Sequence, residues 1–490
     1  MDLLNSGLKE ISDAVKSKKI SALEATKFFL NRIDKLNPQL NAYIAVSVDA
    51  EKEAKAIDEK VAKGGDAGLL AGVPFGIKDM LCTKGLRTTA GSKILENFIP
   101  PYDATVVKRL RDAGVVVLGK LNNDEFAMGS SNETSYYGPV KNPWNPEYVP
   151  GGSSGGSAAA QAAKLAAGTI GTDTGGSIRQ PANFCGIVGI KPTYGRVSRY
   201  GIVAYASSLD QAGPMVSTVE DAALTLEVIC GKDPMDSTTA QKSVPAFSKN
   251  LKADVKGLKI GLIKEYMQSG LDPDVQKTLD NAITELKKLG AEFVDVEIPL
   301  TEMSVPVYYL IATSEASSNL ARYDGVKYGF RAHKENQMSV TLEDFYSETR
   351  GAGFGTEVKR RIMLGTYCLS SGYYDAYYNK SCQVRRLLRQ QFLDAFKKCD
   401  VLLAPVTATP AFKIGTRVTD PLKMYLNDIF TTSTNLAGLP GMSVPFGKSK
   451  DGLPIGLQLT APHFEEQRIL NVGLAMQQVS PVKGDKPHVI

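Results

Sequence analysis

Hydrophobic side chains recur every three or four positions over residues 1–45, with polar positions between them. Such spacing places the apolar side chains on one face of a helix. Within this stretch, Ser21 is followed three positions later by Glu24, the pairing of a capping box at a helix N-terminus. The apolar stripe that follows consists of Ala25, Phe29, Ile33 and Leu36. The pattern predicts two helices in this region.

Helix-like and strand-like patterns alternate in two later regions. In residues 103–119, the amphipathic stretch DATVVKRLRDAG leads into the β-branched run VVVLG. In residues 257–299, the apolar run 258–263 precedes a helix that begins at Asp272 and Pro273 and stops at Gly290, before the strand-like FVDVEI. The apolar face of that helix comprises Val275, Leu279, Ala282, Ile283, Leu286 and Leu289. Both regions predict strand–helix–strand units.

Units of this kind build a sheet that is covered by helices on both faces. We therefore predict an α/β protein in which residues 1–490 form one large α/β/α domain with a mixed, mostly parallel central sheet. The N-terminal helices occupy 1–45, a catalytic core about 65–230, and the half that completes a substrate pocket about 257–480. The polar, turn-rich residues 232–256 are expected to form a long surface excursion.

Composition is that of an ordinary globular protein: 43% of the 490 residues are hydrophobic, 22% are charged, and the net charge is +5. The densest basic clusters are 359–361 and 385–386, both in helix-like segments. Solvated helix faces or local ion pairs explain them more readily than contact with nucleic acid.

The six cysteines show no CxxC pair or metal-ligand spacing. We expect no metal site, and with no signal peptide or long apolar run we expect a cytoplasmic protein.

A glycine- and serine-rich segment, PGGSSGGSAAAQAAKLAAG, occupies residues 150–168. A flexible linker is disfavoured because an alanine-rich helix, expected over 157–167, follows at once. A nucleotide loop is disfavoured because the segment contains neither GxxxxGK[ST] nor GxGxxG. The remaining interpretation is a serine-rich loop at a helix N-terminus, where backbone amides gather.

The next segment, GTIGTDTGGSIRQPANFCG at 168–186, surrounds Ser177 with glycine. A helix of about 11 residues rises roughly 16 Å, and an extended run of GTIGTD returns roughly 16 to 20 Å. Ser153 and Ser177, 24 positions apart, can therefore meet at one end of this element pair. The small neighbours predict that a substrate carbonyl can reach Ser177 and touch backbone amides.

A reactive serine needs a base, and the chain has only three histidines, at 333, 463 and 488, none of them in a motif. A Ser-His-Asp triad is therefore disfavoured. A lysine kept neutral by burial is the alternative, and Lys78, which ends the apolar run GVPFGI, fits that role. Taken alone, Lys78 would be an ordinary lysine at a strand end; the two serine segments favour the catalytic interpretation.

Together, GVPFGIKD, GGSSGGSAAA and GTDTGGSIRQPA resemble the amidase signature family. The resemblance implies the amidase signature fold and a Ser–cis-Ser–Lys catalytic set. In it Ser177 is the acylated nucleophile, Ser153 is the bridging serine after a cis peptide bond, and Lys78 is the base. It also implies an oxyanion hole in the segment that comprises Thr174, Gly175, Gly176 and Ser177.

Three downstream segments, 308–329, 357–378 and 424–445, resemble the glutamine-hydrolysing subunits of tRNA-dependent amidotransferases within this family. A site for free glutamine needs a cation for the α-carboxylate and a carboxylate for the α-ammonium group. The resemblance implies that Arg361 and Asp428 fill these two roles and that Tyr308 borders the substrate. Arg361 as one of several helix basics and Asp428 as a turn residue remain open alternatives.

The same resemblance implies partner chains, namely a small subunit and a second, larger one that is a kinase and binds tRNA. The ammonia released from glutamine would serve the ATP-dependent conversion of Glu-tRNA(Gln) to Gln-tRNA(Gln). ATP and Mg²⁺ would act on a partner subunit, with no cofactor in this chain and no membrane contact. Two other functions stay open: a stand-alone hydrolase of small amides and a catalytically silent scaffold. The intact Lys78, Ser153 and Ser177 argue against the scaffold.

Overall fold

The structure, a computed structural model, describes residues 1–267, 270–332, 341–417, 424–487 and 489. Within these residues eleven strands form one sheet in the order β1-β3-β2-β4-β6-β5-β10-β11-β9-β7-β8. The strands are β1 (Tyr43–Val46), β2 (Pro74–Lys78), β3 (Val116–Leu121), β4 (Gly168–Asp173), β5 (Val188–Lys191), β6 (Gln211–Val216), β7 (Lys259–Ile263), β8 (Glu292–Val296), β9 (Val401–Pro405), β10 (Gly441–Lys448) and β11 (Pro454–Thr460). Strands from the N-terminal and C-terminal halves of the chain thus share one sheet.

The prediction of an α/β fold with a mixed sheet is confirmed, but the prediction that the sheet is mostly parallel is wrong. Among the described strands, β2 pairs in parallel with β3 and β4, and β7 with β8 and β9. The other six pairings are antiparallel. The parallel pairs include the strand–helix–strand units that the sequence pattern marks. The centre is antiparallel because β10 and β11 form a hairpin and β6 runs against both β4 and β5.

The described residues form helices α1 (Leu8–Lys16), α2 (Ala22–Leu40), α3 (Ala50–Ala62), α4 (Thr105–Asp112), α5 (Gly155–Ala162), α6 (Arg179–Cys185), α7 (Val219–Ile229), α8 (Lys264–Met267), α9 (Pro273–Lys288), α10 (Ser304–Leu320), α11 (Leu342–Gly353), α12 (Thr356–Leu369), α13 (Lys380–Ala395), α15 (Thr432–Leu436) and α16 (Glu466–Val479). The two N-terminal helices are confirmed, with the Ser21 hydroxyl accepting from the amide of Glu24 at 3.0 Å. Asp272 caps α9, as predicted. Helix α5 spans 155–162 and not the predicted 157–167.

Helices cover both faces of the sheet. A side chain built at Gly441 of β10 would meet Arg179 of α6, whereas one built at Gly473 of α16 would meet Met442 and Val444 of the same strand. Because successive residues of a strand point to opposite faces, α6 and α16 lie on opposite sides of β10. Residues 174–178, which contain Ser177 and lead directly into α6, are called the nucleophile turn below, and this arrangement places them on one face of the sheet.

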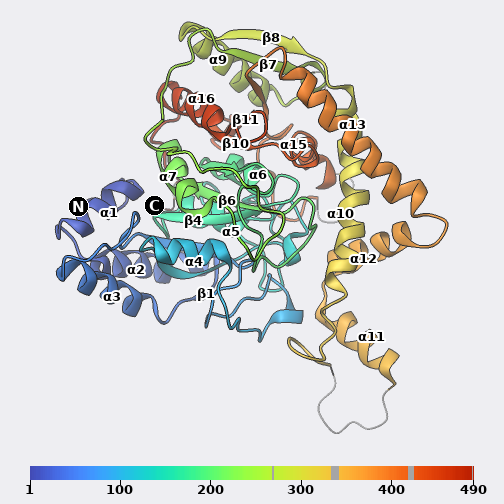
Figure 1. Ribbon diagram of the computed structural model, residues 1–490, viewed down its shortest axis with the longest axis horizontal. Coiled ribbons are helices and arrows are strands. Elements are labelled where there is room, and N and C mark those ends of the chain that lie inside the picture. Colours follow the sequence, from blue (N-terminus) through green and yellow to red (C-terminus); the bar gives the residue numbers. More distant parts are fainter. Residues whose placement is uncertain (268–269, 333–340, 418–423, 488, 490) are drawn as a thin grey trace.

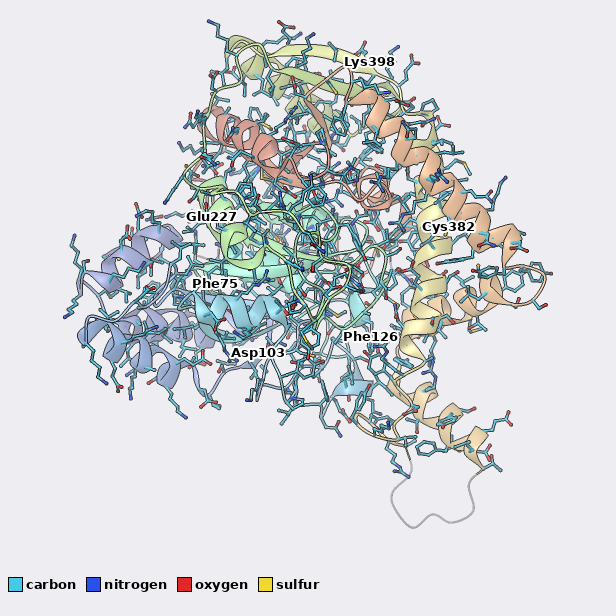
Figure 2. The ribbon with its side chains drawn as sticks, viewed as in Figure 1. Phe75, Asp103, Phe126, Glu227, Cys382 and Lys398 are labelled. Atoms are coloured by element: carbon cyan, nitrogen blue, oxygen red, sulfur yellow. The ribbon has the colours of Figure 1, made fainter. Side chains whose placement is uncertain are left out.

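Two groups of helices extend beyond the sheet. Helices α1 to α4 gather at the lower left of Figure 1, and α10, α12 and α13 form a column at its right edge. Side chains fill the space around the sheet (Figure 2), and Phe75 and Phe126, both labelled there, are completely buried. Residues 232–256 contain no helix or strand, in agreement with the predicted excursion. Among the described residues, no helix is long and apolar enough to cross a membrane.

Candidate active site

Ser177 lies in a tight turn between β4 and α6, and a buried carboxylate holds that turn. Asp173, the last residue of β4, accepts the amides of Gly176 at 2.9 Å and Ile178 at 3.1 Å. Burial alone would raise the pKa of Asp173, but the Arg179 guanidinium, 3.1 Å away, holds it at about 2. The turn is therefore fixed by an ionised aspartate beneath it.

The glycines beside Ser177 are required by close packing. A Cβ atom at Gly175 would lie 2.6 Å from the ring of Tyr308. Gly176 has a φ of +138°, and a Cβ atom there would lie 2.2 Å from the hydroxyl oxygen of Thr431. Any larger residue would clash at both positions, so these glycines bring segments from the C-terminal half against the turn. The serine itself is 8% exposed.

Lys78 is the last residue of β2 and is completely buried. Its ammonium nitrogen lies 2.7 Å from the hydroxyl of Ser153 and 2.8 Å from that of Ser154. Burial lowers the pKa of Lys78 to about 7, against the opposing attraction of nearby carboxylates, the largest from Asp124. Near pH 8 this lysine is mostly neutral and can accept a proton from a hydroxyl.

The two serine segments meet as the spacing predicts. The Gly152–Ser153 peptide bond is cis, in line with the family resemblance. The amide of Ser154 donates to the carbonyl of Ser177 at 3.2 Å. Because Lys78 holds the hydroxyl of Ser153, the structure brings all three residues of the expected catalytic set together. The hydroxyl of Ser177 has no hydrogen-bond partner among the residues that the structure describes.

The segment expected to form the oxyanion hole is only partly available. The amide of Gly176 already donates its hydrogen bond to the carboxylate of Asp173. Thr174 is anchored through its hydroxyl, which donates to Asp210 at 2.7 Å. The amides of Thr174, Gly175 and Ser177 have no acceptor in the described part of the chain. These three free amides can therefore serve a developing oxyanion, whereas Gly176 contributes its backbone conformation.

Arg361, on α12, is almost completely buried, at 2% exposed. Its guanidinium donates to the carboxylate of Glu357 at 2.8 Å and to the hydroxyl of Tyr205 at 2.7 Å. It also lies 5.1 Å from the ring centre of Tyr309 and 5.5 Å from that of Tyr425. This is a permanent buried cation held by aromatic rings, with one carboxylate partner.

Asp428, in the short helix η5 (Leu426–Asp428), is the corresponding buried anion. The hydroxyl of Ser130 donates to its carboxylate at 2.6 Å, and the hydroxyl of Tyr309 approaches at 3.5 Å. Burial raises the pKa of Asp428 to about 7, although Ser130 and the positive charge of Arg361 favour the ionised form. A bound ammonium group would stabilise the carboxylate further.

These charged groups are linked to the nucleophile turn. The amide of Thr431 donates to the carbonyl of Asp428 at 3.1 Å, and its hydroxyl donates to the carbonyl of Gly175 at 2.7 Å. Tyr308 packs on Gly175 from the same side. A pocket of about 260 Å³ opens beside them; its walls include Ser130, Ser131, Glu357, Arg361 and Tyr425. The structure thus places Tyr308, Arg361 and Asp428 around one region next to Ser177.

Sequence reasoning missed several side chains of this region. Ser154 contacts Lys78 as closely as Ser153 does, and the doubled serine of GGSSGG is a signal that could have marked it. Ser130, Tyr205 and Tyr309 come from three other segments and carry no local motif. Of these three residues, only Tyr309 has a signal in the sequence, namely the pair of tyrosines at 308–309.

Neither a histidine triad nor a metal site is found in the described residues. His463 hydrogen-bonds the carbonyl of Ala437 at 2.9 Å, whereas His333 and His488 lie outside the described residues. No group of three or more His, Cys, Asp and Glu side chains within the described ranges could hold a metal ion. All six cysteines are free.

The chain is similar to known proteins over its whole length. The chain is 72% identical over 490 residues to the A subunit of glutamyl-tRNA(Gln) amidotransferase from Bdellovibrio bacteriovorus, with each chain covered completely. The crystal structure of the A subunit of the same enzyme from Thermotoga maritima is similar, with a TM-score of 0.82, 41% identity, and coverage of 100% of this chain and 99% of that one. The structure of peptide amidase from Stenotrophomonas maltophilia is also similar to this chain, with a TM-score of 0.82, 30% identity and 97% coverage of both chains.

The profile of the amidase family matches residues 24–470. That range contains Lys78, both serine segments, Arg361 and Asp428, so it includes the whole site described above. The match extends over most of the chain, and the relatives cover nearly all of the rest. The chain is a member of the amidase family.

Proposed function

We propose that this chain hydrolyses glutamine to glutamate and ammonia, and that the ammonia serves the conversion of Glu-tRNA(Gln) to Gln-tRNA(Gln) on a partner subunit. The observation that carries the proposal is the buried pair of opposite charges, Arg361 and Asp428, beside the Ser177 turn. A free amino acid presents a carboxylate and an ammonium group, and these two residues complement both. The full-length likeness to A subunits of glutamyl-tRNA(Gln) amidotransferase supports the assignment.

In the proposed mechanism, neutral Lys78 takes the proton of the Ser153 hydroxyl, while Ser153 takes the proton of Ser177. The Ser177 oxygen then attacks the side-chain amide carbon of glutamine. The negative charge that develops on the amide oxygen is stabilised by the free amides of Thr174, Gly175 and Ser177, in the segment that also contains Gly176. The proton returns through Ser153 to the leaving nitrogen, and ammonia departs.

The glutamyl ester on Ser177 is then hydrolysed. A water molecule loses its proton along the same path to Lys78 and attacks the ester carbon, and the Ser177 oxygen leaves and recovers a proton. Throughout, the α-carboxylate is held by Arg361 and the α-ammonium by Asp428, with Tyr308 bordering the substrate. Arg361 keeps Glu357 as a neighbour, so the substrate carboxylate binds a guanidinium that is already oriented.

Ammonia production alone does not amidate a tRNA. We propose that this chain acts in the cytoplasm with a small subunit and a larger partner that is a kinase and binds tRNA, and that ATP and Mg²⁺ bind to this larger partner. Glu-tRNA(Gln) would meet the complex mainly through the same partner. The chain itself would need no cofactor for the chemistry derived above.

A stand-alone amidase is the second candidate, because peptide amidase shares the fold at 30% identity. An enzyme for lipid or aryl amides needs an apolar acyl pocket. Here the pocket is lined by Glu357, Arg361 and two serines, one of which, Ser130, donates a hydrogen bond to Asp428. Charged groups of both signs at this place favour glutamine over an apolar amide.

Substitution of Asp428 by Asn, or of Arg361 by Ala, should raise the KM for glutamine roughly tenfold to a hundredfold. Each removes a charge that holds an α-group, remote from the bond that breaks. Attack on a small neutral amide without α-groups should change much less. Steady-state rates with both substrates test this, with the exposed Lys359→Ala on the same helix as the control. Equal losses on both substrates would make Arg361 and Asp428 structural residues.

A further inference from the structure

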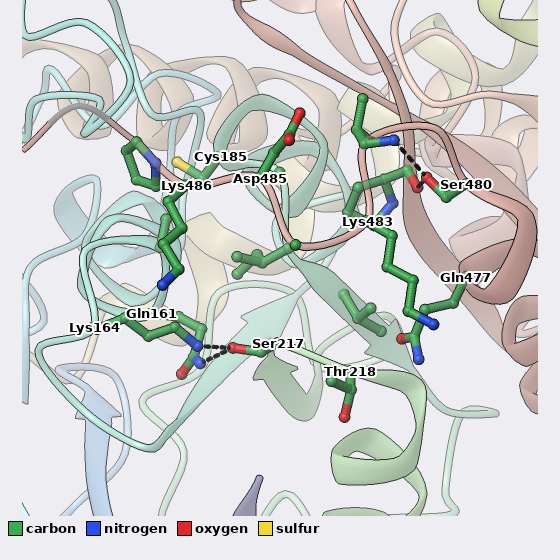
Figure 3. Close-up of a pocket in the computed structure, with 18 of the residues that line it drawn as sticks. Gln161, Lys164, Cys185, Ser217, Thr218, Gln477, Ser480, Lys483, Asp485 and Lys486 are labelled. Carbon is green, nitrogen blue, oxygen red and sulfur yellow. Dashed lines mark hydrogen bonds between the residues drawn. The ribbon is translucent and has the colours of Figure 1, made fainter. Parts of the chain in front are cut away.

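A second cavity lies away from the active site and has no role in the proposed reaction. This tail pocket, of about 280 Å³, is formed between the end of α5, the start of α7, the end of α16 and the chain segment 482–487. Figure 3 shows Lys164, Gln161 and Ser217 grouped on one wall, with Lys486 extending toward them from the tail. Lys483 extends from the same tail near Gln477.

The hydrogen bonds on this wall leave one donor without a partner. The oxygen of Ser217 accepts from the ammonium of Lys164 at 2.6 Å and from the side-chain amide nitrogen of Gln161 at 2.8 Å. A hydroxyl oxygen has two lone pairs, and both are now used. The proton of Ser217 must therefore be donated elsewhere, and no acceptor for it is found among the described residues.

The same wall leaves one acceptor without a partner. Gln161 is completely buried, and its Oε1 atom has no hydrogen-bond donor in the described part of the chain. The orientation of this amide is fixed because its nitrogen also donates to the carbonyl of Ala167 at 3.3 Å. An unpaired buried acceptor is costly, so a ligand that donates a hydrogen bond to it would be favoured.

The pocket also carries more positive than negative charge, because its lining residues include three lysines and one aspartate. Lys164, Lys483 and Lys486 form no ion pair among the described residues, although the carboxylate of Asp2 attracts Lys486. Asp485 is paired with Lys448 at 2.7 Å. Burial lowers the pKa of the Lys164 ammonium, and repulsion by Lys486 lowers it further, although Asp221 opposes both. The carboxylate of Asp221 is itself occupied by the amide of Leu8 at 2.8 Å.

We propose that the tail pocket binds a hydrogen phosphate ion, with Lys164, Lys486 and Ser217 donating to its oxygens and its own O–H donating to Oε1 of Gln161. Water could satisfy the hydrogen bonds but not the charge. Sulfate and carboxylates satisfy the charge, but at neutral pH they carry no proton for Gln161. A phosphomonoester, with a second pKa of about 6, has also lost that proton at about pH 7.5. This site is independent of the proposed glutaminase function.

Isothermal titration of the full chain with inorganic phosphate at about pH 7.5, in a buffer free of other oxyanions, tests the proposal. We expect saturable binding with one site, weakened roughly tenfold by Lys486→Met and at least as much by Lys164→Met. Sulfate and glycerol phosphate should bind roughly tenfold more weakly than phosphate, because Gln161 then stays unpaired. The exposed Lys249→Met, which removes the same charge from the surface, should bind as the wild type does.

Phosphate should also raise the melting temperature of the wild type more than that of Lys486→Met, since a ligand stabilises the state that binds it. Lys486 is exposed, so this variant is expected to fold even if Lys164→Met does not. Absence of saturable phosphate binding, or equal binding by Lys486→Met and the wild type, would overturn the site. Sulfate binding as tight as that of phosphate would overturn the assignment to hydrogen phosphate.

Discussion

Ser177→Ala, assembled with its partner subunits, is expected to lose glutamine-dependent formation of Gln-tRNA(Gln) by about 10⁴-fold or more. The same complex should still form Gln-tRNA(Gln) when ammonium chloride and ATP are supplied. The reason is that Ser177 attacks only the donor amide, whereas activation and transfer are proposed to occur on another chain. Assays that follow the amidation of Glu-tRNA(Gln), with glutamine or with ammonium as the donor, measure both activities in one preparation.

Ser157→Ala is the matched control for this experiment. Its hydroxyl is buried in α5 and donates to the carbonyl of Ile170 at 3.1 Å, and among the described residues it has no hydrogen bond to Lys78 or to the nucleophile turn. This variant should keep the glutamine-dependent reaction. Failure of ammonium to rescue Ser177→Ala would show that Ser177 acts in assembly or transfer. Full-speed hydrolysis of simple amides by the wild-type chain without partners would favour the stand-alone amidase.

Lys78→Ala should lower the glutaminase rate by about 10³-fold, because it removes the base that draws a proton through Ser153. In the wild type, burial lowers the pKa of Lys78 from 10.5 to about 7. Below about pH 7 the lysine is protonated and cannot act as a base, so the rate should fall about tenfold per pH unit and level off above pH 7. Rates of both proteins over this pH range measure the effect.

Lys120 provides a matched comparison, since it is a buried lysine on the neighbouring strand β3. Its ammonium lies 3.4 Å from the carboxylate of Asp79 and donates to the hydroxyl of Thr88 at 2.7 Å. Lys120→Met should lower the melting temperature and leave the midpoint of the pH profile unchanged. If Lys78→Ala keeps more than about a tenth of the rate, the base lies elsewhere.

The local parts of the fold follow from sequence patterns. The helix-and-strand unit around α4 and β3 and the unit from β7 to β8 are marked by periodicity and caps within about 40 residues. The antiparallel centre could not be predicted in this way. Strand β10 pairs with β5, about 250 positions earlier in the chain, and nothing within either strand specifies that partner. Extrapolation from the strand–helix–strand units therefore overestimated the parallel pairing.

In the candidate active site too, residues in local motifs could be predicted from the sequence, whereas residues brought together from distant segments could not. Ser153 and Ser177 could be found because two adjacent segments place each of them among glycines at a fixed interval, and Lys78 because it ends the apolar run GVPFGI. The part of the pocket that surrounds Arg361 could not, because Tyr205 and Tyr425 belong to segments far apart in the sequence that meet only in the folded chain. The hydrogen bond from the Gly176 amide to Asp173 could not be predicted either, since a sequence does not show which acceptor a backbone amide binds.

The central claim is that glutamine is hydrolysed through an ester on Ser177. The most direct measurement is mass spectrometry of peptides from the wild-type protein, quenched in acid during turnover of glutamine. The peptide that contains Ser177 is expected to carry one glutamyl group, and Ser177→Ala should show none. A glutamyl group on Ser153, or on any of the six cysteines, would contradict the account.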